Sequence, residues 1–201
     1  SSFVDDGSVV VKKNSVLVLK LEDLVKDFAP KSDDPFAQIL GLEQKKIGLN
    51  SILNAIDNAK YDDQIIGLSI ESLMIQGGMA QVQEIRDKIY EVKESGKFVT
   101  AFADVYEQKN YYLSSVADSI YVNPEGLIDF RGLSGEVLFF KDFQEKYGIK
   151  MEVIRHGKYK SAVEPFLANE MSEANREQTE AFLNSIWSEM IVDIEESRNV
   201  E

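Results

Sequence analysis

The 201-residue sequence contains no cysteine and only one histidine. The absence of cysteine excludes thiol catalysis, disulfide bonds and thiolate metal sites. A single histidine cannot form the H-E-x-x-H motif of zinc metalloproteases. The glycine-rich P-loop and G-x-G-x-x-G motifs are also missing, so the sequence does not indicate nucleotide binding. We therefore expect no metal and no cofactor, although carboxylate pairs such as Asp62–Asp63 leave metal catalysis as a weak option.

Basic residues are scarce, and no hydrophobic run is long. Twenty-two lysines and arginines stand against 35 aspartates and glutamates, which gives a net charge of −13. A nucleic-acid-binding surface needs basic residues to neutralise phosphates, so we expect no nucleic-acid partner. The same charge opposes electrostatic docking to anionic lipid. No stretch approaches the roughly 18 apolar residues of a membrane span. We interpret the chain as a soluble part of a longer protein.

The apolar residues present are spaced as alternating strands and helices. Short apolar runs predict strands over residues 16–21, 64–70, 97–103 and 118–124, the last ending at Pro124. Helical spacing predicts helices over residues 49–60 and 110–117, and a third that carries Val82, Ile85, Ile89 and Val92 and closes at Ser95–Gly96. This alternation is typical of an α/β fold with parallel strand pairing. We expect one domain over residues 1–201.

The second half of the chain adds a helix over residues 135–148, a strand over 149–155 and a long helix from Ser172. The long helix has a broad apolar stripe, formed by Phe182, Leu183, Ile186, Trp187, Met190, Ile191 and Ile194. This stripe packs either on the chain's own core, or against a partner subunit or a missing half of the protein. Residues 28–48, which contain two prolines, are predicted to form a flap or loop.

The segment RHGKYKSAVEPF contains the chain's only histidine, His156, beside Lys160 and Ser161. We interpret His156 as an ordinary strand-end or surface residue. Side chains at adjacent positions point in different directions, so Lys160 and Ser161 are not expected to be acid–base partners. The pattern SAVE resembles a capping box in which Ser161 caps a turn and Glu164 reaches back. Pro165 is expected to limit this turn.

Lys160 can act as a general base only if it is neutral, which requires burial to lower its pKa to about 7–8. Its neighbours Tyr159, Ala162, Val163 and Phe166 are compatible with burial. On residues alone, Lys160 is therefore a modest candidate for a catalytic base.

The octapeptide YKSAVEPF follows ILNAIDNAKYDDQIIGLSI, ESGKFVTAFAD and YYLSSVADSIYVNPEGLIDFRGL, and precedes MSEANRE. In this order the segments resemble the amino-terminal half of the long, doubled form of the signal peptide peptidase A (protease IV) family. The resemblance runs from about Val16 to about Asn199. It implies a crotonase/ClpP-like fold of repeated β-β-α units, with a long C-terminal helix. It also implies that Lys160 is the general base of a Ser–Lys dyad whose serine lies in a C-terminal domain.

One departure from the family agrees with this division of roles. The position that matches the nucleophile of the serine-bearing domain is Gln108, followed by Lys109 and Asn110, so no hydroxyl is present there. Gly77–Gly78 resembles the turn whose backbone N–H groups form the oxyanion hole. Without a local serine, these glycines are expected to serve as a strand-to-helix turn.

The resemblance further implies signal-peptide substrates, assembly into tetramers, and an anchor that holds the domain on the non-cytoplasmic side of a membrane. The fragment alone is expected to be inactive. Two alternatives remain open: a non-catalytic scaffold domain, and a crotonase-type acyl-thioester enzyme. The second would need a basic cluster to bind coenzyme A, and we find none in the sequence.

Overall fold

The computed structural model describes residues 10–28, 46–149, 151–152 and 161–200. The chain divides into two compact units. The first unit comprises Ser1–Arg131 and Ile194–Glu201, and the second comprises Gly132–Asp193. That residues 1–201 form a single crotonase-like domain stays a prediction.

The first unit contains a four-stranded parallel sheet with the order β1-β4-β5-β6. Its strands are β1 (Ser15–Leu19), β4 (Ile65–Ile70), β5 (Phe98–Glu107) and β6 (Ser119–Asp129). Their register places Val18 opposite Ser69, and Ser69 opposite Thr100. The prediction of an α/β fold with parallel pairing is therefore confirmed.

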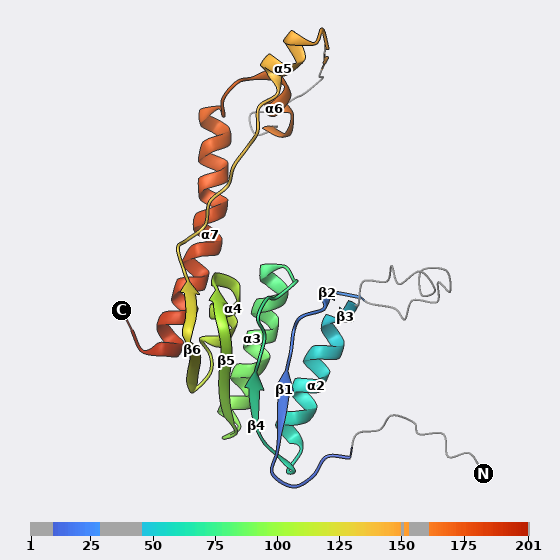
Figure 1. Ribbon diagram of the computed structural model, residues 1–201, viewed down its shortest axis with the longest axis vertical. Helices are drawn as coiled ribbons and strands as arrows, with labels where there is room; N and C mark the ends of the chain where they lie inside the picture. Colours follow the sequence, from blue (N-terminus) through green and yellow to red (C-terminus); the bar gives the residue numbers. More distant parts are fainter. Residues whose placement is uncertain (1–9, 29–45, 150, 153–160, 201) are drawn as a thin grey trace, which may run out of the picture. The chain divides into compact units, whose positions relative to one another are not determined.

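Three helices connect these strands and lie along one side of the sheet (Figure 1). They are α2 (Leu49–Tyr61), α3 (Met79–Glu94) and α4 (Gln108–Ser114). A second, two-stranded parallel sheet pairs β2 (Leu24–Lys26) with β3 (Lys46–Gly48). The end of the predicted flap is thus the strand β3, while residues 29–45 lie outside the described part of the chain.

The core of the first unit lies between the sheet and its helices. Along β5, Val99 and Ala101 are buried, whereas Phe98 and Phe102 are 41% and 47% exposed on the opposite face. The predicted stripe of α3 is fully buried, with Val82, Ile85, Ile89 and Val92. The helix ends at Ser95–Gly96, where Gly96 has a φ of +89°.

Strand β6 continues past Pro124, so the prediction that this proline ends the strand is wrong. Its register passes from Ala103↔Val122 to Val105↔Leu127, which leaves residues 123–126 as a bulge opposite Asp104. The bulge needs glycine at position 126, because a Cβ atom there would lie 2.1 Å from the carbonyl oxygen of Asp104. Proline is tolerated at such a place because β6 is an edge strand.

The second unit contains short helices and most of one long helix. These elements are α5 (Lys141–Lys146), the 3-10 turn η1 (Ser161–Val163), α6 (Glu164–Leu167) and α7 (Glu173–Arg198), of which the last five residues belong to the first unit. The predicted helix over 135–148 is therefore wrong over 135–140. Phe140 N–H donates to the carbonyl oxygen of Pro165 (2.6 Å), and the helix begins after it. Ile149, Met151 and Glu152 show no strand, and the rest of the predicted strand over 149–155 lies outside the described residues.

Glu164 and Pro165 differ from expectation. Pro165 lies in the first turn of α6, where a backbone N–H would have no acceptor within the helix. Its lack of an N–H therefore costs no helical hydrogen bond, and Glu164 remains helical. The carboxylate of Glu164 accepts from the hydroxyl of Ser172 (2.5 Å) and from Asn175 Nδ2 (3.0 Å). Glu164 thus stabilises the start of α7. The side chain of Ser161 lies outside the described part.

The long C-terminal helix is confirmed, and α7 has 26 residues. The predicted apolar stripe of α7 is only partly buried. Met190 and Ile194 are buried, whereas Phe182 is 64% exposed. Both alternatives for the stripe therefore remain. Among the described residues, no helix combines the length and apolar character that crossing a membrane requires.

Candidate functional site

Two segments singled out in the sequence meet in the first unit. The Gly77–Gly78 turn lies between β4 and α3, and Gln108 is the first residue of α4, directly after β5. The ammonium group of Lys109 donates to the carbonyl oxygen of Gly77 at 2.7 Å and so joins the two segments. Because β4 and β5 are adjacent and parallel, both segments follow carboxyl ends of strands, where α/β proteins commonly bind ligands.

The glycine turn is closed by a side chain of its own helix. Gly78 N–H donates to Gln81 Oε1 at 2.9 Å, and Gln81 Nε2 donates to Asp27 Oδ1 at 2.6 Å. The amide oxygen of Gln81 therefore occupies a backbone donor that an oxyanion would need. The expectation that this turn links a strand to α3 is confirmed. Sequence reasoning missed Gln81 and Asp27, although a Gln three residues after an N-cap position is a recognisable capping signal.

The start of α4 is also fixed by internal hydrogen bonds. Asn110 is 1% exposed, and its Nδ2 donates to the carbonyl oxygen of Ser72 at 2.5 Å. The hydroxyl of Ser72 accepts from Leu21 N–H at 2.9 Å. These groups hold the loop after β4 against α4 and against the segment that follows β1, so we assign them a structural role.

The buried residue Tyr106, near the end of β5, adds the one strongly shifted pKa in this region among the described residues. Burial raises the pKa of Tyr106 to about 12. Its hydroxyl donates to the carbonyl oxygen of Tyr121 on β6 at 3.1 Å. Tyr106 thus remains protonated at neutral pH and ties the two strands together.

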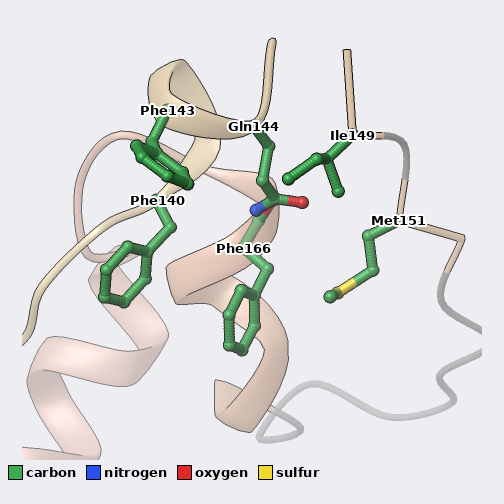
Figure 2. A pocket seen from close by; sticks show the side chains of 6 residues that line it. All are labelled: Phe140, Phe143, Gln144, Ile149, Met151 and Phe166. Atoms are coloured by element: carbon green, nitrogen blue, oxygen red, sulfur yellow. The ribbon is translucent and has the colours of Figure 1, made fainter. Parts of the chain in front are cut away.

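Lys160 and His156 lie outside the described residues, so the position of the predicted base stays a prediction. The described residues on both sides of Lys160 form a cavity of about 230 Å³ in the second unit (Figure 2). It is lined by Phe140, Phe143, Gln144, Ile149, Met151 and Phe166. Sequence reasoning missed this cavity, although VLFFKDF and EPF are unusually rich in phenylalanine for surface segments.

Comparison with known proteins identifies the family. The sequence model of peptidase family S49 matches residues 91–201, which is more than half of the chain. The chain belongs to peptidase family S49. The resemblance to signal peptide peptidase A is thereby confirmed, and the mixed α/β fold with its parallel sheet is consistent with this family.

Three relatives place this S49 chain among the named proteases. The chain is 33% identical to Protease 4 of Haemophilus influenzae, in a match that covers all of this chain and 34% of the relative. It is 32% identical to Protease 4 of Salmonella typhi over 81% of the chain and 27% of the relative. It is 29% identical to the chloroplastic serine protease SPPA of Arabidopsis thaliana over 89% of the chain and 25% of the relative. The chain thus spans about a third or less of these relatives.

Proposed function

We propose that this chain is the lysine-bearing domain of a serine endopeptidase, with Lys160 as general base and a serine from another domain of the same protein as nucleophile. Neutral Lys160 takes the proton from the serine hydroxyl as that oxygen attacks a peptide carbonyl. Lys160 then returns the proton to the leaving amine, which completes acylation. Water releases the acyl group in a second step that uses the same base.

The observation that carries this proposal is the closed turn of the first unit. The chain has Gln108 where the family has its nucleophile, and Gln81 accepts the hydrogen bond from Gly78 N–H. A place that resembles a serine site thus lacks both a hydroxyl and a free oxyanion donor. The chain's catalytic contribution must then come from elsewhere, and Lys160 matches the family's base.

The wider features follow from the resemblance and are proposed with it. The relatives are named Protease 4 and serine protease SPPA, which supports hydrolysis of peptide bonds. We propose remnant signal peptides as substrates, a crotonase-like fold for the domain, and a homo-tetramer as the assembled state. An anchor outside these residues would hold the domain at the non-cytoplasmic side of a membrane.

The direct test replaces Lys160 in the full-length protein. We expect Lys160→Ala to reduce hydrolysis of a fluorogenic peptide by at least about 10³-fold, within the range of general-base contributions and lost dyad function. Lys109→Ala is the matched control, because Lys109 contacts the closed turn, and it should retain most activity. Near-normal turnover by Lys160→Ala would remove Lys160 from the mechanism and favour the non-catalytic scaffold.

A second test uses the 201-residue chain alone. A base without a nucleophile cannot form an acyl-enzyme, so we expect neither peptide cleavage nor labelling by a serine-directed acylating probe. Addition of the separately expressed serine-bearing half should restore both. Labelling of a serine in the isolated chain, with matching turnover, contradicts the split dyad.

A further inference from the structure

The four-stranded sheet of the first unit has its three crossover helices on one side because of its strand order. The strands follow one another across the sheet in chain order, β1-β4-β5-β6, without a reversal. Crossovers between parallel strands are right-handed, so an order that runs in one direction places every connecting helix on the same side. Figure 1 shows α2, α3 and α4 on that side. These connecting helices therefore cannot cover the second face of the sheet.

The second face carries a continuous set of large apolar side chains. Alternate residues of each strand point to it, and each of the large ones is 38–57% exposed: Val16, Val18, Phe98, Phe102 and Tyr121. The register aligns Phe102 with Tyr121 on the neighbouring strand. A Cβ atom at Gly67 would lie 2.6 Å from the ring of Phe98, so this ring lies over β4. The apolar surface thus extends across all four strands.

A sheet of parallel strands normally has both faces covered. Such sheets occur almost only where other elements pack on both sides, and an apolar patch of several large residues marks an interaction site. The helix side of this sheet follows the rule, since Val99 and Ala101 are fully buried there. The second face is therefore the side on which we expect a partner.

The edge of this face at the carboxyl ends of the strands is polar. Ser69 Oγ donates to Glu71 Oε1 at 3.1 Å, and Lys20 Nζ lies 3.6 Å from Glu71 Oε2. Asp104 lies on the same side of β5 as the exposed phenylalanines and accepts from Asn123 Nδ2 at 2.9 Å. An apolar centre with a polar rim is the usual composition of a contact between proteins.

The carboxylates of the first unit argue against a second copy of the chain as this partner. A two-fold contact between two such faces, with strands in the same direction, brings Glu71 of one copy toward Asp104 of the other. With strands in opposite directions, Asp104 approaches the apolar end around Phe98. Contact with the helix side of a second copy is no better, because the exposed surface of α3 carries Glu84 and Glu94. Each arrangement brings carboxylates together or against apolar residues, and both are unfavourable.

We propose that the second face of the sheet is the docking surface for another domain of the same protein, whose apolar side chains cover Phe98, Phe102 and Tyr121. The length of the relatives supports this occupant. The match to Protease 4 of Haemophilus influenzae covers all of this chain but only 34% of the relative, so most of that polypeptide lies beyond the match. A domain tethered in the same chain has a high effective concentration. The inference rests on the proposed function in that it takes a domain of the same protein as the partner.

Photocrosslinking in the full-length protein identifies what covers the face. The photoreactive residue p-benzoyl-L-phenylalanine is incorporated in place of Phe102 and, in a control protein, in place of Tyr90, which is exposed on α3. We expect the probe at position 102 to crosslink within one chain, to a segment outside these 201 residues, which peptide mass spectrometry identifies. The probe at position 90 should give little of this product. A product of twice the chain mass on a denaturing gel indicates a second copy and overturns the proposal, as does a crosslink to residues 132–193 or none at all.

A second measurement uses the native side chains of the full-length protein. We expect hydroxyl radicals to oxidise Tyr121 at least about fivefold more slowly than Tyr90, as for a residue in the buried centre of an interface. In this chain Tyr121 is the more exposed of the two, at 57% against 45%. Phe102→Asp should raise the oxidation of Tyr121 to the rate of Tyr90, because a carboxylate is costly to bury against apolar side chains. Tyr61→Asp, at the exposed end of α2, is the control and should leave Tyr121 protected. Equal oxidation of Tyr121 and Tyr90 in the parent protein overturns the proposal.

The outcomes separate the docking surface from the proposed function. If the full-length protein cleaves no peptide although the probe at position 102 crosslinks to another domain of the same chain, the proposed function fails and the docking surface stands. If the protein cleaves peptides while Tyr121 is unprotected and the crosslink is absent, the docking surface fails and the proposed function stands.

Discussion

The two units differ in how they treat large apolar side chains. In the first unit, residues of the sheet and helices such as Ile56, Leu68 and Ile85 are completely buried. Among the described residues of the second unit, Met190 is the only buried hydrophobic residue, while Leu138 and Phe182 are 73% and 64% exposed. The first unit therefore has a core of its own. The second unit presents apolar surface that suits ligands or partners.

The two units also differ in the places that resemble binding sites. In the first unit, Gly78 N–H and Gly77 C=O already have partners in Gln81 and Lys109. In the second unit, the cavity between Phe140 and Met151 has apolar walls. A turn that resembles an oxyanion hole is thus internally satisfied, whereas the unit without a comparable core contains an apolar cavity. A turn that has the shape of a known site does not by itself identify where a protein binds its ligand.

The largest expected effect comes from the core of the first unit. Ile85→Ala in α3 should lower the free energy of unfolding by about 2–5 kcal/mol, because Ile85 is fully buried and its loss leaves a cavity. Phe182→Ala in α7 should change it by less than about 0.5 kcal/mol, since its side chain is mostly exposed. Urea-induced unfolding followed by circular dichroism measures both.

Equal destabilisation by the two substitutions would contradict the contrast between the units. It would mean that Phe182 packs in solution against a surface that the chain alone does not provide. Measurement at several protein concentrations separates that case, because a partner copy makes stability depend on concentration.

The next effect concerns pH and the buried hydroxyl of Tyr106 in the first unit. Its pKa is raised from 10.0 to about 12 by burial, so the unfolded chain loses this proton at lower pH than the folded chain does. The resulting stabilisation is complete below pH 10 and is lost as pH rises toward 12. Tyr106→Phe should abolish this alkaline loss of about 2 kcal/mol. Parallel stability curves for the two proteins from pH 9 to 12 would show that Tyr106 titrates normally.

A smaller effect is expected at the start of α7 in the second unit. The hydroxyl of Ser172 donates to Glu164 and accepts from Asn175 N–H at 3.3 Å. Ser172→Ala removes both contacts and should lower stability by about 1 kcal/mol, as for other lost caps. Hydrogen exchange should accelerate in the first turn of α7 while β4 and β5 keep their protection. Faster exchange in β4 and β5 instead would mean that the two units unfold together.

The first unit could be predicted well from the sequence because the spacing of its apolar residues determines where its helices and strands lie. The spacing of Val82, Ile85 and Ile89 places α3, and Gly96 marks its end. Strand β6 was predicted too short, because Pro124 signals a break and the bulge opposite Asp104 depends on tertiary contacts. The second unit was predicted less well. Its phenylalanines suit a helix over 135–148, but the bond from Phe140 N–H to Pro165 is long-range and has no local signal.

The candidate site was only partly predictable for a similar reason. Gly77–Gly78 and Gln108 were found from the sequence because motif order indicates them. Gln81 has a local capping signal, but its bond to Asp27 joins positions 54 residues apart, so no local pattern shows that bond. The same holds for the cavity, whose walls come from two sides of the Lys160 segment.

The smallest effect is expected on the surface of the first unit, where α2 meets α3. Glu91 bonds Lys88 and Lys60 at 2.9 Å each, and these two hydrogen bonds lower the pKa of its carboxyl. The stabilisation is present above the unfolded pKa of about 4.3 and is lost as pH falls through the lower folded value. Glu91→Gln should therefore be slightly less stable than the parent at pH 7, and the difference should vanish at pH 2–3. Because the pair is partly exposed, the effect is small and weakens with salt. Glu94→Gln, at an exposed position near the end of α3, makes the same charge change and is the matched control. Identical pH profiles for the two variants would mean that the ion pairs of Glu91 do not stabilise the first unit.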